Sequence, residues 1–222
     1  MHRLPEQPGT LTVATRTDLP HGVREDVGAR ALLKSRSTVN NMTHFDPMPD
    51  YLSTDRLRLR PWTEADAPPY RDLWLERDPR SLRVVSADGR PTVEDLRDNI
   101  RSELATTALT GFGLMAVEGR AERNFIGYCG LIGRDASPDQ PELAYELLRA
   151  AHRRGYGTEA ARAVLDAAAA TGRSRLWAAV RVWNTASLRV LEKLGFVSSG
   201  QVNEDREHGD SVLLTRRLTR PS

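Results

Sequence analysis

The feature that most constrains the fold is a strand candidate that leads through a glycine turn into an amphipathic helix. The strand candidate covers residues 142–148, follows a turn predicted at residues 137–139, and precedes glycines at positions 155 and 157. From about Gly157 to Thr171, apolar side chains recur three and four residues apart, which is typical of a helix with one buried face. A strand, a tight turn and an amphipathic helix in this order predict a sheet that is covered by helices.

Strand and helix signals alternate over the region from residue 51. In residues 56–60 arginine alternates with leucine, which predicts a strand with one covered face. Thr63 and Thr92 each precede an acidic residue by three positions, as at a capped helix start, and the second helix has an apolar stripe that extends to Leu104. Further strands are predicted at residues 112–118, 124–132, 176–182, 196–201 and 211–218, and a further helix at residues 185–194. The order β-α-α-β-β-β-α-β-α-β-β predicts an α/β fold (α+β mixed sheet) with about seven strands and about four helices.

Composition and charge exclude several classes of function. The net charge of +2 over 222 residues lacks the positive excess of a nucleic-acid-binding protein, and no aromatic-basic signature accompanies the arginines. No stretch approaches the roughly 20 apolar residues that span a bilayer, and no apolar run of a secretory signal follows Met1. The single cysteine, Cys129, agrees with a reducing compartment and is expected in the core. We therefore expect a cytoplasmic protein without a nucleic-acid or membrane partner.

Residues 1–50 differ in composition from the rest of the chain. They mix Pro, Thr, Asp, Arg and Asn, with only a weak amphipathic stretch around Val23 to Leu33. We expect a disordered or loosely packed N-terminal extension here, followed by one domain over residues 51–222. No cluster of histidine, cysteine and acidic residues has metal-ligand spacing, so no metal is expected in either part.

The turn at Arg153–Thr158 has the chemistry of an anion site. Its glycines allow a tight turn, and the N–H groups that begin the next helix can point together at a phosphate. An ordinary strand-to-helix turn has the same pattern, so these residues alone leave both interpretations open. A P-loop is disfavoured because its Gly-x-x-x-x-Gly-Lys-Ser/Thr motif is absent. The dinucleotide fingerprint is also disfavoured, because Ala160 replaces its third glycine and no acidic residue ends the next strand near Val182.

Several separated motifs follow the turn chemistry in a recognisable order. These are Glu-Leu-Ala-Tyr-Glu-Leu at 142–147, the Gly155/Gly157 turn, Asn-Thr-Ala-Ser at 184–187 and Leu-Glu-Lys-Leu-Gly-Phe at 191–196. Together they resemble the GNAT (GCN5-related) N-acetyltransferase superfamily over about residues 51–218. The opening at Thr54–Asp66 resembles the branch of bacterial N-terminal acetyltransferases of ribosomal proteins. The resemblance implies a GNAT-like fold, in which two central strands of the sheet splay apart.

The resemblance also implies acetyl-CoA as co-substrate. In the family, the turn that matches Arg153–Thr158 holds the pyrophosphate through backbone N–H groups, and the strand before it pairs its backbone with the pantetheine arm. His152 stands where glutamine or arginine is commonest, which should cost little because the backbone supplies most of the binding. Asn184 matches an asparagine that binds the cofactor arm, although a helix cap is its ordinary role. The implied cofactor-binding residues are Tyr145, Leu147, Arg153, Arg154, Gly155, Tyr156, Gly157, Thr158 and Asn184.

Acetyl transfer from a thioester to an amine also needs a base for the amine and an acid for the leaving thiolate. Many family members use a tyrosine as the acid, and Leu191 stands at that position in this chain. In the resembling branch, a serine three residues after the asparagine can act as the acid instead, and Ser187 stands at that position. Glu142 matches a family position that often holds the base, and Glu146 on the same strand face is the second choice. A small helix residue and a solvated glutamate are the structural alternatives for Ser187 and Glu142.

These residues predict an acetyl-CoA-dependent N-acetyltransferase whose acceptor is a protein or peptide N-terminal α-amine. The α-amino pKa is about 8 and that of lysine about 10.4, so deprotonating lysine at neutral pH costs roughly 3 kcal/mol more. A water-relayed carboxylate therefore suits an α-amine better. Acetylation of a small-molecule amine and a non-catalytic acyl-CoA-binding module remain alternatives. The sequence leaves open the identity of the acceptor and whether the chain forms a homodimer, as some relatives do.

Overall fold

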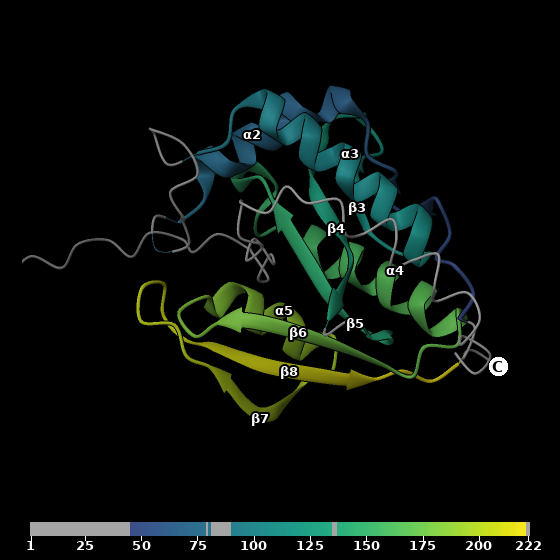
Figure 1. Ribbon diagram of the computed structural model, residues 1–222, viewed down its shortest axis with the longest axis vertical. Coiled ribbons are helices and arrows are strands. Elements are labelled where there is room, and N and C mark those ends of the chain that lie inside the picture. Colours follow the sequence, from purple (N-terminus) through teal and green to yellow (C-terminus); the bar gives the residue numbers. More distant parts are fainter. Residues whose placement is uncertain (1–44, 79, 81–89, 135–136, 221–222) are drawn as a thin grey trace, which may run out of the picture.

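The computed structural model describes residues 45–78, 80, 90–134 and 137–220, and eight strands in these ranges form one mixed sheet (Figure 1). The strands are β1 (Leu52–Ser53), β2 (Leu57–Arg60), β3 (Leu114–Gly119), β4 (Phe125–Arg134), β5 (Ser137–Leu147), β6 (Arg175–Arg181), β7 (Val197–Asn203) and β8 (Ser211–Arg217). The helices are α2 (Ala67–Glu76), α3 (Val93–Thr110), α4 (Tyr156–Ala170) and α5 (Thr185–Lys193), with short 3-10 helices at Glu64–Asp66 and Arg149–Ala151. The predicted order of elements is confirmed, with the short β1 added.

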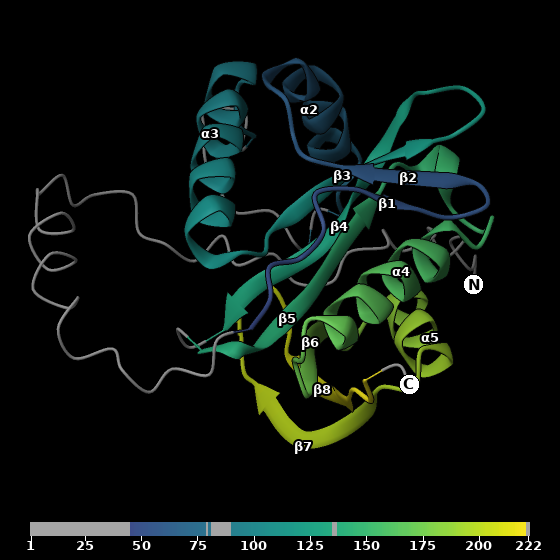
Figure 2. The same ribbon diagram turned by 90° about the vertical axis from the view of Figure 1, so that its right-hand side faces the viewer.

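The strand order is β1-β2-β3-β4-β5-β6-β8-β7, and the helices cover both faces of this sheet (Figure 2). On one face, Ala116 of β3 and Tyr128 of β4 pack in a cluster with α2 and α3. On the other face, Tyr145 and Leu147 of β5 pack in a cluster with α4 and α5. Because successive side chains of a strand point to opposite faces, Glu142 and Glu146 lie on the face of α2 and α3.

Both predicted helix starts are present with their capping boxes. Thr63 and Asp66 form the first box, and Thr92 and Asp95 form the second, in which the Thr92 hydroxyl accepts the Asp95 N–H at 3.2 Å. Asp66 also accepts two hydrogen bonds of 2.7 Å from the Arg60 guanidinium, which ties the start of α2 to β2. The sequence pattern therefore located these starts correctly because a cap is a local interaction.

Two local predictions were wrong. Leu104 is 37% exposed, whereas its neighbour Glu103 turns inward and accepts the Leu114 N–H at 2.7 Å. The turn predicted at residues 137–139 lies inside β5, because Ser137 pairs directly with Arg134 and closes the β4–β5 hairpin earlier. Pairing with β4 thus overrides the turn preference of these residues.

The predicted extension over residues 1–50 is described only from Phe45 onward. The Met48 N–H donates to the Gly111 carbonyl at 2.7 Å, and the Asp46 N–H donates to the Thr171 carbonyl at 3.3 Å. Residues 45–50 are therefore bound to the ends of α3 and α4. Residues 1–44 lie outside the described part, where the extension stays a prediction. No helix among the described residues is long and apolar enough to cross a membrane.

Candidate active site

The candidate site lies where β5 and β6 separate. These two strands are parallel neighbours that share one register pair, Glu142 with Trp177, whereas β5 pairs with β4 along most of its length. Beyond that pair, the Ala179 N–H of β6 is bound by the Glu142 carboxylate at 3.2 Å rather than by a backbone carbonyl of β5. The central strands therefore splay toward their carboxyl ends, as the family resemblance implied.

The splay leaves one edge of β5 without a strand partner beyond Glu142. The Leu148 N–H donates to the Ile126 carbonyl at 2.9 Å, on the β4 side. Because backbone groups alternate along a strand, Leu147 and Tyr145 direct theirs toward the separation. The side chains of both residues are buried beneath α4, so any contact with a ligand in the separation would be made by their backbone groups. Their position beside the cofactor arm stays a prediction.

The predicted anion turn joins β5 to α4 and has unusual backbone angles. Arg153 and Gly155 both have positive φ, of 59° and 82°, and Gly155 is the N-cap of α4. Such a turn brings successive N–H groups together at the positive end of a helix, where the first four N–H groups lack intrahelical partners. Arg153 and Arg154 are exposed beside it. The backbone therefore fits a pyrophosphate.

His152 reaches back from this turn to β5. Its Nε2 lies 2.8 Å from the Leu147 carbonyl oxygen, so the imidazole holds a backbone group on the open edge of β5. The prediction that His152 costs little is compatible with this bond, because it leaves the N–H groups of the turn unaffected. The histidine thereby ties the turn to the strand that precedes it.

The start of α4 is also fastened from outside, by residues to which the sequence analysis assigned no role. Glu159 accepts hydrogen bonds from the Thr54 hydroxyl at 2.5 Å and from the Arg56 guanidinium at 2.5 and 2.8 Å. Arg56 also donates to the Arg154 carbonyl at 3.0 Å and lies over the Tyr156 ring. The signal was present, since Thr54 and Arg56 belong to the opening motif typical of the resembling branch.

The start of α5 places Asn184 and Ser187 together. The Asn184 side chain accepts the Ser187 N–H at 3.1 Å, which confirms its role as a helix cap. The Tyr145 hydroxyl donates to the Ser187 carbonyl at 3.4 Å, and burial raises the pKa of Tyr145, so this phenol stays protonated. The Ser187 hydroxyl is buried and has no hydrogen-bond partner among the described residues.

An unpartnered buried hydroxyl costs about 1–3 kcal/mol, which a polar ligand atom would recover. Ser187 therefore fits a site for a bound polar group at the start of α5. Leu191, at the position of the family tyrosine, is fully buried in the core and has no proton to give. Of the two hydroxyls in the first turn of α5, that of Ser187 is buried, whereas Thr185 is exposed.

The two glutamates of β5 have different surroundings. Glu142 is half-buried at the point of separation and bonds to Ala179. Glu146 is fully buried, and its two oxygens accept hydrogen bonds from Arg77 at 2.5 to 3.0 Å and from the Tyr128 hydroxyl at 3.0 Å. Glu146 is therefore committed to a buried ion pair, which leaves Glu142 as the base candidate on this face.

The loop between β7 and β8 is held by specific bonds near the end of β6. Asp205 forms an ion pair with Arg181 at 2.9 Å. The pKa of Asp205 is lowered, most of all by the hydrogen bond that its carboxylate accepts from the His208 backbone N–H. The Trp183 indole donates to the His208 carbonyl at 3.1 Å, and Arg80 lies over its ring at 4.3 Å. Trp183 and Arg80, absent from the sequence analysis, thus connect this loop with the segment after α2.

Comparison with known proteins agrees with this geometry. The sequence matches the family model of the acetyltransferase (GNAT) domain over residues 56–197. The chain belongs to the GNAT acetyltransferase family. The match includes β5, the turn, α4, Asn184 and Ser187. Among the described residues, no three or more His, Cys, Asp or Glu side chains form a group that could hold a metal ion.

Individual proteins are similar to this chain in sequence or in fold. The uncharacterized protein YkkB of Bacillus subtilis is 32% identical over 148 residues, which cover 65% of this chain and 83% of YkkB. A crystal structure of an acetyltransferase from Agrobacterium tumefaciens is 26% identical, with a TM-score of 0.61 over 79% of this chain and 98% of that one. RimL, a ribosomal L7/L12 alpha-N-protein acetyltransferase solved with coenzyme A, has a TM-score of 0.65 at 15% identity, covering 79% of this chain and all of RimL. At that identity the likeness to RimL shows the fold alone.

Proposed function

We propose that this GNAT protein transfers an acetyl group from acetyl-CoA to an amine nitrogen, and that the acceptor is the α-amine of a protein or peptide N-terminus. The observation on which the proposal rests is the buried hydroxyl of Ser187 at the start of α5, which has no partner among the described residues and whose backbone carbonyl accepts the hydroxyl of Tyr145 from β5. A hydroxyl without a partner at this position suits a donor to the sulfur that leaves during acetyl transfer.

The cofactor would be held mainly by backbone groups of this chain. The N–H groups of Arg153–Thr158 suit its pyrophosphate, and the open edge of β5 at Tyr145 and Leu147 suits its extended amide chain, in the manner of an added strand. Asn184 adds a side-chain amide at the end of β6. When bound, acetyl-CoA supplies a thioester whose carbonyl carbon accepts the amine.

Acid and base would act from opposite faces of the sheet. Ser187, on the face of α4 and α5, donates its hydroxyl hydrogen bond to the leaving sulfur. Glu142, on the face of α2 and α3, accepts the amine proton, directly or through one water molecule. This separation lets the acceptor enter from one face while the cofactor occupies the other.

The preference for an α-amine is supported by its lower pKa, which a half-buried carboxylate can match more easily than that of lysine. It is also supported by the similarity of the fold to RimL, which is described as acting on an α-amino group.

This proposal is tested by measuring thiol release from acetyl-CoA in the presence of different acceptors. The acceptors are peptides with different N-terminal residues, the same peptides with blocked N-termini, and small amines. Release that depends on a free peptide N-terminus supports it. Release with lysine side chains or small amines alone contradicts the acceptor class, and binding of acetyl-CoA without release for any acceptor contradicts the enzyme. Glu142→Gln is the informative variant, because glutamine keeps the acceptor oxygen for the Ala179 N–H but cannot take a proton. We expect it to lower kcat/KM by ~100-fold.

A further inference from the structure

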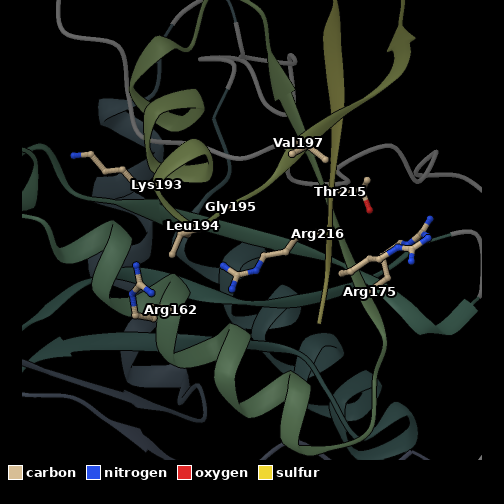
Figure 3. Close-up of a pocket in the computed structure, with 9 residues that line it drawn as sticks. Arg162, Arg175, Lys193, Leu194, Gly195, Val197, Thr215 and Arg216 are labelled. Atoms are coloured by element: carbon tan, nitrogen blue, oxygen red, sulfur yellow. The ribbon is translucent and has the colours of Figure 1, made fainter. Parts of the chain in front are cut away.

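A basic groove lies away from the separation between β5 and β6. Figure 3 shows it between α4, the end of α5 and the last residues of β8, and it has a volume of about 560 Å³. Its cationic residues are Arg162, Arg175, Lys193, Arg216 and Arg217. We refer to these five residues and the space between them as the basic groove.

The described residues do not compensate the charges of the basic groove. None of its five cations forms an ion pair or side-chain hydrogen bond with another residue in the described part of the chain. The lining of the groove contains these five cations and no acidic residue. In a chain whose net charge is only +2, five cations around one groove are a local excess. Like charges that share one groove repel each other, and an anionic ligand would relieve this.

Three of the five cations have a local contact that orients them. Lys193 stands in the last turn of α5, where a cation interacts favourably with the helix dipole. Arg216 lies over Gly195, because a Cβ added to Gly195 would lie 3.7 Å from the guanidinium of Arg216. Arg175 lies 5.8 Å from the Trp177 ring centroid. These contacts orient the guanidinium groups but leave their hydrogen-bond donors available to carboxylates.

The lining favours a peptide over a nucleic acid. Leu194 and Val197 also line the groove, and Val197 is 63% exposed at the start of β7. An apolar contact of this kind suits a side chain of a peptide. The groove has no aromatic lining residue on which a base could stack, and the chain lacks the overall positive charge that attracts a phosphate polymer. A peptide with carboxylates on either side of an apolar residue therefore matches the groove better than a nucleic acid does.

The basic groove is distinct from the candidate active site. Lys193 and Asn184 stand at opposite ends of α5, about 13 Å apart along its axis at the rise of an α-helix. Arg175 begins β6, and Asn184 follows the end of that strand. Arg162 lies beyond the first turn of α4, after the proposed pyrophosphate turn. A ligand could therefore occupy the groove while the separation between β5 and β6 is filled.

We propose that the basic groove binds an acidic peptide segment of a partner protein, with carboxylates paired to its arginines and an apolar side chain against Val197. Binding is independent of acetyl-CoA. The proposal goes beyond the acetyl transfer proposed above and does not require it.

Fluorescence anisotropy with a labelled peptide of glutamates around one central leucine tests this proposal. The full-length protein is compared with the double variant Arg162→Glu, Arg216→Glu, which we expect to bind at least ~10-fold more weakly. The matched control is Arg123→Glu, Arg189→Glu, which removes the same charge from exposed positions outside the groove and should bind as the wild type does. If the glutamate variant fails to fold, as judged by circular dichroism, Arg162→Gln with Arg216→Gln replaces it.

Three results would overturn the proposal. One is that the acidic peptide does not bind, or that a peptide with glutamine in place of each glutamate binds with the same affinity as the acidic peptide. Another is equal loss of binding in the control variant, which would show that only net charge matters. The third is competition by another ligand. Displacement of the peptide by saturating coenzyme A would assign the groove to the cofactor. Tighter binding of a single-stranded RNA of equal charge than of the peptide would assign the groove to nucleic acid. Loss of acetyl transfer in the screen above would leave these results unaffected.

Discussion

Asn184 and Ser187 are joined by a hydrogen bond of 3.1 Å from the Ser187 N–H to the Asn184 side chain, and this bond fixes the first turn of α5. The same arrangement leaves the Ser187 hydroxyl buried and without a partner among the described residues. A cap and a cofactor contact are therefore compatible roles for Asn184. The cap holds the serine in place, and the serine supplies the unpaired polar atom.

Ser187→Ala should separate chemistry from folding. Removing a buried hydroxyl without a partner ends its desolvation cost and should raise the free energy of unfolding by at most about 1–3 kcal/mol. Loss of the proposed acid lowers kcat by ~100-fold, while the affinity for acetyl-CoA changes little. Steady-state kinetics, thermal denaturation and calorimetry measure the three quantities. Turnover equal to wild type would exclude Ser187 as the acid.

Asn184→Ser should show whether the asparagine does more than cap α5. Serine is as good an N-cap, so the free energy of unfolding should stay within about 0.5 kcal/mol of wild type, whereas Asn184→Ala should lose ~1 kcal/mol. If the amide also binds the cofactor, both variants weaken acetyl-CoA binding to a similar degree. Isothermal titration and urea denaturation distinguish the roles. Full affinity in the serine variant would leave capping as the sole function.

The sequence predicted the local features of this fold well. The capping boxes at Thr63 and Thr92, the turn at Gly155 and the cap at Asn184 depend on neighbouring residues, and the structure contains all of them. The positions of Tyr145 and Leu147 followed from the family resemblance, since splaying of two strands is a property of the whole sheet.

Features that join distant segments were missed. Arg77 and Glu146 are 69 positions apart, and neither the burial of Arg77 nor its partner can be inferred from the residues around it. Glu146 therefore looked like a second base, whereas its oxygens bind Arg77 and Tyr128. The apolar stripe of α3 predicts a buried Leu104, which is 37% exposed, because the helix period does not show which turns of a helix are covered by other elements.

The buried pair of Arg77 and Glu146 predicts an asymmetric result in a double-mutant cycle. Arg77→Met leaves a buried carboxylate without its cation and should lower the free energy of unfolding by ~3–5 kcal/mol. Adding Glu146→Leu removes that charge and should recover most of the loss. Guanidinium denaturation of the four proteins provides the cycle. A double variant no more stable than the Arg77→Met single variant would contradict the pairing.

Asp66 predicts a loss of stability in acid. Burial alone would raise the pKa of Asp66, but hydrogen bonds from Arg60 and Thr63 outweigh it and lower the pKa below its usual value. The stabilisation is therefore complete above the unfolded pKa of about 3.9 and is lost as pH falls below that value toward the folded pKa. Thermal melts from pH 7 to pH 2 should show Asp66→Asn less stable than wild type near neutrality, with the difference shrinking at low pH. Exposed Asp55→Asn is the control, and a difference that grows as pH falls would contradict this assignment.

The two glycines of the turn should respond differently to alanine. Gly155 has a φ of 82°, a left-handed conformation that costs an alanine about 1–2 kcal/mol, so Gly155→Ala should be destabilised and bind acetyl-CoA poorly. Gly157 lies inside α4, where a Cβ would meet Leu147 and Tyr145 at ordinary contact distances of 3.7 and 3.9 Å. Gly157→Ala should therefore keep its affinity and gain about 0.5–1 kcal/mol of stability from the better helix former. Thermal denaturation with and without coenzyme A measures both effects. An equal loss of affinity in the two variants would show that glycine is required for ligand contact at both positions. It would contradict a requirement that arises from the backbone conformation of Gly155.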